Sequence, residues 1–342
     1  MKKLFTILAV AATLVSCAKE DVVREAAREA IGFDNAFVEN STRSVYDPSF
    51  DADNMFSDFA VYGFVEGATL FDGTRVAKED LADDQTKTGW EYEGTQYWIA
   101  GAKYNFNAVA PLTDGGWTKT EATKDATTLS FTNNGTTDLL YAYATAEGKV
   151  SGNATVGFTF RHTLSKVKLS FENAYNATNA TIKVRDVKIT DAYSTGNVVL
   201  TDATAWSTQS GKLELAFGNA VADDATSTDA PAFAYKTTLE SYNELFMIPG
   251  AGATSFTVTN GETTTSKTGY TVKFTVDLLV SDVVVATYPH TIYTDFAPVA
   301  GNSYDLKATI NATNIDPNHA QEPIEFTVNT LPGWGTTNNQ NI

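Results

Sequence analysis

The sequence has little of the chemistry that enzymes and metalloproteins use. Its 342 residues include one cysteine, Cys17, so an internal disulfide and a cysteine-based zinc site are both excluded within one chain. The three histidines, His162, His290 and His319, lie far apart, and none has the two-histidine spacing of a metal site. A glycine-rich phosphate loop and a nucleophile elbow are also missing. The sequence therefore predicts no enzyme, no cofactor and no metal site.

Positive charge is scarce as well. The chain has 24 Lys and Arg residues against 41 Asp and Glu residues, a formal net charge of −17. Nucleic acid and anionic lipid surfaces both attract proteins through clusters of basic side chains. We therefore expect no nucleic-acid partner and no electrostatic docking on a membrane.

An apolar run long enough to span a membrane as a helix is also missing from the sequence. The apolar stretch Leu4–Val15 follows the basic residues Lys2 and Lys3, and it is too short for a transmembrane helix. It ends in LVSC, which resembles a bacterial lipobox. We expect residues 1–16 to be a signal peptide and Cys17 to carry the lipid (including palmitate) that anchors the chain to the outer membrane. The alternative is an ordinary signal peptide with an incidental cysteine.

Residues that favour β-structure are abundant. The chain has 15 Tyr and 20 Phe residues, together with much Thr and Val. Short alternating runs separated by turn residues continue from position 59 onward, and no long run has helical periodicity. This pattern predicts an all-β protein built from sandwiches. The polar segment 172–180 favours a boundary there, dividing residues 44–173 from residues 174–342.

The segment after Cys17 changes character at Ile31. Residues 19–31 are rich in helix formers and charge, so we expect a tether with a short helix. Ile31, Phe33 and Phe37 then fall on alternate positions, as in a strand with one buried face, although Asn35 interrupts that face. The alternation predicts one β-strand ahead of the first sandwich.

Three blocks of sequence resemble one known family. WEYEGTQYWIAGAKYNFNAVAP (90–111), FTFRHTLSKVKLSFEN (158–173) and IEFTVNTLPGW (324–334) are similar, in this order, to blocks of the fimbrillins, the type V pilus subunits of Bacteroidales. The resemblance implies two tandem transthyretin-like β-sandwich domains and no enzymatic activity. It also implies export as a lipoprotein, proteolytic removal of an N-terminal strand, and polymerisation by strand exchange.

The resemblance gives the N-terminal segment a role. A cut between Arg43 and Ser44, in a loop rich in turn residues, would free residues 17–43 with their alternating strand. The exposed sheet edge would accept a donor strand by β-augmentation. Three alternating residues near the C-terminus have the period of such a donor: Ile324, Phe326 and Val328.

These interpretations predict the partners and the location. The partners are other pilus subunits, an Arg-specific processing protease, and surface ligands of host or bacterial origin; the precursor lies at the outer membrane and the product in a cell-surface fimbrium. The alternative is a surface-anchored, non-polymerising lipoprotein that binds glycans or proteins. Exposed Trp90, Trp98 and Trp117 would stack on sugars, but strand-rich cores also bury tryptophan, and we favour the core. Only the polymerising subunit needs the cut at Arg43.

Overall fold

Every regular element in the described part of the chain is a β-strand. The computed structural model describes residues 29–38, 56–78, 89–201, 204–222, 225–260 and 263–331. No helix occurs among them, and the strands form sheets of seven, six, five and four strands. The all-β class predicted from the alternation is therefore confirmed.

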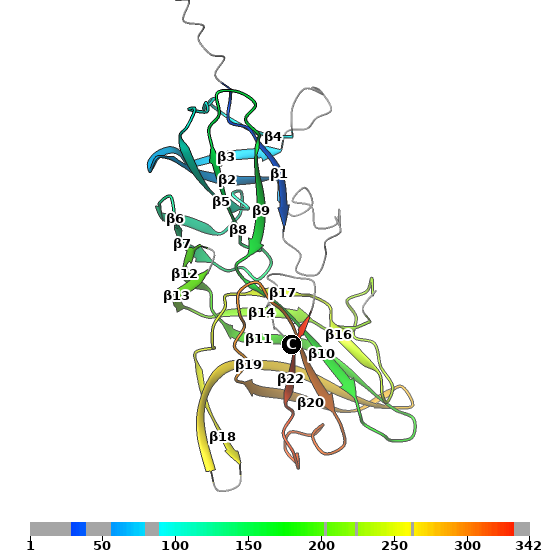
Figure 1. Ribbon diagram of the computed structural model, residues 1–342. Coiled ribbons are helices and arrows are strands. Elements are labelled where there is room, and N and C mark those ends of the chain that lie inside the picture. The colour runs from blue at the N-terminus through cyan, green and yellow to red at the C-terminus, as the bar shows by residue number, and fades with distance from the viewer. Residues whose placement is uncertain are drawn as a thin grey trace, which may run out of the picture.

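The seven-stranded sheet carries the N-terminal strand at its edge. Its order is β1-β9-β8-β5-β2-β3-β4. The bounds are β1 Phe33–Val38, β2 Asp58–Val65, β3 Ala68–Lys78, β4 Trp90–Tyr92, β5 Lys103–Ala110, β8 Leu140–Glu147 and β9 Val156–His162. All neighbouring strands run antiparallel except β1 and β9, which run parallel. Figure 1 shows β1, in dark blue, beside β9.

This sheet rolls around an aromatic core on one of its faces. Phe59, Phe106 and Phe158 are buried there together with two tryptophans, Trp90 and Trp98. The sheet closes far enough for its two edge strands to meet, because the rings of Phe33 in β1 and Tyr92 in β4 lie 5.4 Å apart between centroids. Burial of large aromatic side chains is the main stabilising term of such a core. The core interpretation of Trp90 and Trp98 is confirmed.

A four-stranded sheet covers the other face of the seven-stranded sheet. Its order is β13-β12-β7-β6, with bounds β6 Trp117–Ala122, β7 Thr127–Thr132, β12 Thr195–Leu200 and β13 Ala205–Ser210. Tyr62 and Val109 of the larger sheet share a buried cluster with Phe131 and Val198 of the smaller one. Trp117 packs against this cluster and is only partly buried.

The remaining two sheets form a second packed pair. The six-stranded sheet contains β10 Ser165–Asn173, β15 Ala220–Val221, β16 Thr238–Ser241, β17 Leu245–Met247, β21 Ser303–Ile310 and β22 Phe326–Leu331. The five-stranded sheet contains β11 Ala180–Ala192, β14 Leu213–Gly218, β18 Thr254–Asn260, β19 Thr263–Val280 and β20 Val283–Thr294. Phe171 and Leu306 from the first sheet and Val184 and Phe274 from the second belong to one buried cluster.

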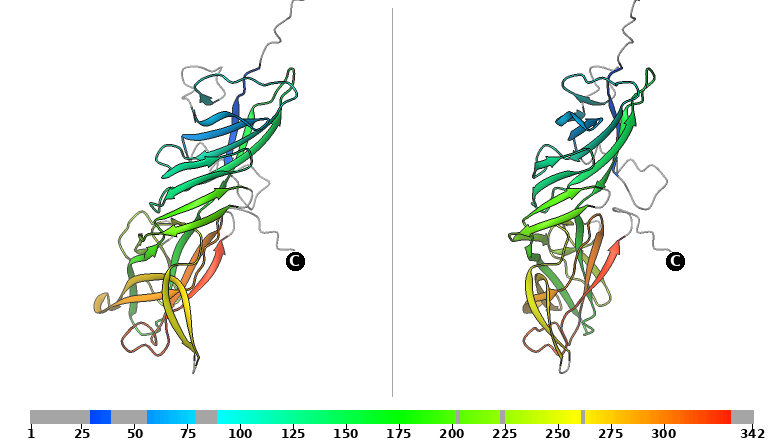
Figure 2. Two further views of the ribbon diagram at one scale, coloured as in Figure 1. Left: turned by 90° about the vertical axis from the view of Figure 1, so that its left-hand side faces the viewer. Right: turned by 60° about the vertical axis from the view of Figure 1, so that its left-hand side comes forward.

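The two pairs of sheets lie end to end (Figure 2), and the chain passes between them more than once. β10 precedes the predicted boundary between residues 173 and 174, yet it pairs with β21 in the second pair of sheets. β12 and β13 follow that boundary, yet β12 pairs with β7 in the first pair. Strands from both sides of residues 173 and 174 therefore share sheets. Alternation reports the buried face of a strand and not the sheet to which the strand belongs.

Candidate functional site

The candidate site is the groove that holds β1 and the residues just before it. β1 lies at the edge of its sheet, with Phe33 opposite Val156 and Val38 opposite Phe160. The register shifts between Asp34 and Phe37, as in a β-bulge. Residues 29–31, which the composition predicts as the end of a short helix, are not helical: Ala30 forms a β-bridge with Tyr97.

Phe33 fills a pocket made by other strands of the rolled sheet. Its side chain is 0% exposed. Its ring centroid lies 5.5 Å from that of Phe71, 6.0 Å from that of Phe106 and 5.8 Å from that of Phe158. Edge-to-face and offset arrangements at these separations are favourable beyond the area that they bury. The ring of one edge strand thus completes the core of the whole sheet.

Backbone hydrogen bonds hold the segment before β1 on both sides. The Ile31 N–H donates to the Gln96 carbonyl at 2.8 Å, and the Trp98 N–H donates to the Glu29 carbonyl at 3.0 Å. The Val156 N–H donates to the carbonyl of Gly32 at 2.8 Å. The Tyr92 hydroxyl also donates to the Ile31 carbonyl, at 2.8 Å. The segment is therefore fixed between the loop around residue 97 and the start of β9.

The Glu29 carboxylate binds a loop through three donors. One oxygen accepts from the Gly152 N–H at 2.6 Å, and the other accepts from the Asn153 N–H and from its side-chain amide, both at 2.7 Å. The loop can aim these groups because Gly152 adopts a φ of 70°, in the left-handed region that glycine favours. The hydrogen bonds, that from the Asn153 backbone above all, hold the pKa of Glu29 below its ordinary value of 4.5.

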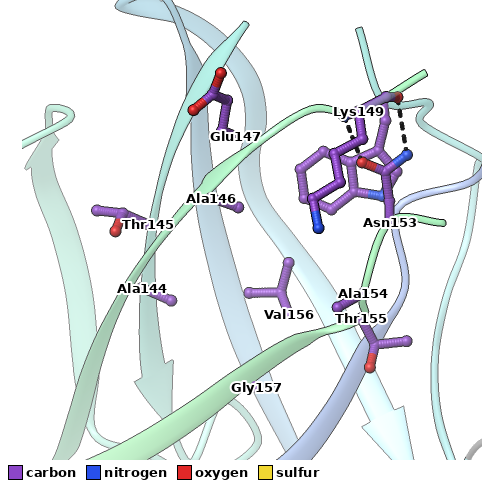
Figure 3. A pocket seen from close by; sticks show the side chains of 11 residues that line it. Ala144, Thr145, Ala146, Glu147, Lys149, Asn153, Ala154, Thr155, Val156 and Gly157 are labelled. Carbon is purple, nitrogen blue, oxygen red and sulfur yellow. Dashed lines mark hydrogen bonds between the residues drawn. The ribbon is translucent and has the colours of Figure 1, made fainter. Parts of the chain in front are cut away.

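A pocket of about 250 Å³ lies beside this segment, between β8 and β9. β8 and β9 pair only at Leu140 with His162 and at Tyr141 with Arg161, so the strands separate beyond these positions. Figure 3 shows small apolar side chains facing the opening from both strands, with Lys149 and Asn153 at its rim; the lining includes Ala144, Ala146 and Val156. From Val156 to Thr159, β9 therefore has its strand partner on the β1 side.

The predicted donor strand is docked within its own molecule. β22 is an edge strand that pairs antiparallel with β21. Ile324 is only 4% exposed, and Phe326 packs with ring centroids 6.4 Å from those of Phe171 and Phe274. Val328 is 43% exposed. Donation to another molecule would therefore require Ile324 and Phe326 to leave this core.

The structure brings some of the predicted site residues together and leaves others untested. Ile31 and Phe33 share one buried cluster, as their alternation predicts. Phe37 belongs to β1, where it pairs with Thr159. Cys17, Arg43 and Ser44 lie outside the described residues, so their roles stay predictions. The sequence reasoning missed the pairing of Glu29 with residues 152–153.

The histidines do not form a site. His162 Nδ1 hydrogen-bonds with the buried Asp138, and His290 Nε2 lies 3.0 Å from the Ile315 carbonyl oxygen. His319 contacts Asp316 at the surface. Across the described ranges, no three potential metal-ligating side chains gather, and no helix has the length and apolar character to cross a membrane.

Comparisons with known proteins define the class. The fimbrillin-like family matches residues 42–330, and this chain belongs to that family. No curated relative matches the sequence. Membership of this family supports an adhesive role at the cell surface.

Solved structures with a similar trace share little sequence with this chain. A candidate cell adhesion protein from Bacteroides ovatus is 16% identical, with 91% of this chain and 99% of that chain covered and a TM-score of 0.46. One from Bacteroides eggerthii is 15% identical, with coverages of 90% and 99% and a TM-score of 0.46. A candidate polysaccharide-binding protein from Bacteroides thetaiotaomicron is 11% identical, with coverages of 92% and 99% and a TM-score of 0.37. These scores are too low to carry an argument about ligands.

Proposed function

We propose that this protein is a structural and adhesive subunit of a fimbrium. It is exported as a lipoprotein whose lipid is attached to Cys17, is cut between Arg43 and Ser44, and polymerises by β-strand exchange. After the cut, the segment that contains β1 is held only by non-covalent contacts. A segment around β22 of a neighbouring subunit then takes its place.

The observation that carries this proposal is the position of β1. It is an edge strand, its Phe33 is fully buried among rings from other strands, and it is the strand partner of β9 from Val156 to Thr159. Loss of β1 would expose unpaired N–H and C=O groups and an apolar hole, both of which a new strand fills. The incoming strand would leave its pairing with β21 in its own molecule and would pair with β9 of the neighbouring subunit.

A second candidate function is a surface lipoprotein that binds glycans or proteins without polymerising. The burial of Trp90 and Trp98 weakens it, because these rings are not available to stack on a sugar. Tyr97 and Tyr143 are exposed aromatic residues that remain for such contacts. This candidate needs no cut at Arg43.

The test is limited digestion of the purified full chain with an Arg-specific protease. We expect a stable fragment that begins at Ser44 and then assembles into polymers, visible as a ladder of oligomers on a gel. Arg43→Ala should remain monomeric. A polymer formed equally well by Arg43→Ala would reject strand exchange and favour the non-polymerising candidate.

A further inference from the structure

The segment that fills the groove has a counterpart elsewhere in the chain. Residues 29–33 read EAIGF, and residues 322–326 read EPIEF. No other glutamate in the sequence is followed by isoleucine two positions later and by phenylalanine four positions later. Both segments read in the same direction, so a strand that contains Glu322 can lie parallel to β9 as β1 does.

The two segments are also anchored alike in the structure. Ile31 and Ile324 are both buried. Phe33 and Phe326 both pack on aromatic rings. Glu322 Oε1 accepts hydrogen bonds from the Asn311 side-chain amide at 2.8 Å and from the Thr313 hydroxyl at 2.5 Å. Each segment therefore presents a carboxylate, an aliphatic residue and an aromatic residue at alternate positions.

The groove accepts the differences between the two segments. Pro323 corresponds to Ala30. The two backbone hydrogen bonds on either side of Ala30 are donated by the N–H groups of Ile31 and Trp98. A proline at position 30, which has no N–H, would therefore remove neither of them. Glu325 corresponds to Gly32. A Cβ there would lie 3.2 Å from Thr155 Cγ2, the methyl of an exposed side chain that can rotate away.

We infer that the loop at Gly152 and Asn153 is a carboxylate site that sets the register of the incoming strand, and that its ligand is Glu322 of a second copy of this chain. The inference rests on the strand exchange proposed above. The incoming glutamate would leave two side-chain donors in its own molecule and gain the three donors that now bind Glu29. Hydrogen bonds to a charged group are stronger than neutral ones, so this contact selects one register among several strand alignments.

The experiment maps the register in polymers of the protease-cut full chain. A photo-reactive benzoylphenylalanine at Gln321 should cross-link to residues 149–153 of the next subunit, as identified by mass spectrometry. Glu322→Gln should weaken subunit association by about ten-fold, since a charged hydrogen-bond acceptor becomes neutral. Glu325→Gln is the matched control and should associate like the parent.

A peptide competition separates the contribution of Glu322 to binding from any effect of the substitution on the folding of the whole chain. A synthetic peptide of residues 321–331 should displace the released N-terminal segment from the cut protein, and the same peptide with Glu322→Gln should need about ten-fold more. Equal potency of the two peptides, or a cross-link outside residues 149–153, overturns the carboxylate site and leaves strand exchange intact. A parent chain that is cut at Arg43 and forms no polymer overturns both.

Discussion

Truncation of Phe33 tests whether one ring holds the edge strand in place. The side chain is 0% exposed and contacts the rings of Phe71, Tyr92, Phe106 and Phe158. Replacement of a buried phenylalanine by alanine costs about 3–5 kcal/mol. That loss is large beside the roughly 5–15 kcal/mol by which a typical domain is stable. Because β1 is an edge strand, we expect Phe33→Ala to lower mainly the free energy of local opening.

Hydrogen exchange of single amides measures that opening. The Trp98 and Val156 N–H groups donate to carbonyls of the segment, and the Ile31 N–H of the segment donates to the Gln96 carbonyl. All three amides become exchangeable when the segment detaches. A loss of about 3–5 kcal/mol corresponds to exchange faster by roughly a hundred- to several-thousand-fold. Phe217→Ala, at an equally buried ring in the second pair of sheets, is the control. If these amides exchange no faster in Phe33→Ala than in Phe217→Ala, the ring does not hold the strand.

Three further substitutions test the anchor and the hydrogen bonds around the groove. Cys17→Ala should abolish fatty-acid labelling and membrane retention; persistent labelling would reject the lipobox. Tyr92→Phe removes the hydroxyl that donates to the Ile31 carbonyl and should destabilise the segment by about 1 kcal/mol, measured by exchange of the Ile31 amide. The Glu29 carboxyl has a lowered pKa, so its contribution is present above its ordinary value of 4.5 and is lost as the pH falls through the lowered value. Lowering the pH should therefore reduce the protection of amides 29–33 in the parent, measured as exchange relative to the intrinsic amide rate at the same pH, whereas Glu29→Gln should show a weaker pH dependence.

Alternation in the sequence was enough to predict strands, and not enough to predict which strands pair. β9 reads buried and exposed at strictly alternate positions, the pattern that predicts a strand with one buried face. β10 follows it with a similar pattern but belongs to a different sheet. The side chains of a strand report which face is buried, and its partners depend on segments far away in the sequence. For this reason strands from both sides of residues 173 and 174 share sheets.

The carboxylate site shows a second limit. Glu29 lies in a stretch rich in Ala, Glu and Arg, whose composition favours a helical tether. Its position is instead fixed by loop amides more than a hundred residues later, and tertiary contacts override local propensity. Every residue except proline has a backbone N–H, so the sequence does not show which of these groups bind Glu29. The repetition of glutamate, isoleucine and phenylalanine at residues 322–326 was the one sequence feature that could have pointed to the site.

The interleaving of the chain has a mechanical consequence. Because β10 and β11 belong to one pair of sheets while β12 and β13 belong to the other, the polypeptide bridges the two pairs at several places along its length. In the fibre proposed above, a pull along the long axis would be shared among several covalent crossings in each subunit, and no single linker between the pairs of sheets would bear the whole load. A parallel strand seated along β9 would meet the same pull in shear, with its hydrogen bonds loaded together and not opened one after another. The weakest link under tension would then lie between subunits, at the exchanged strand, and not within one.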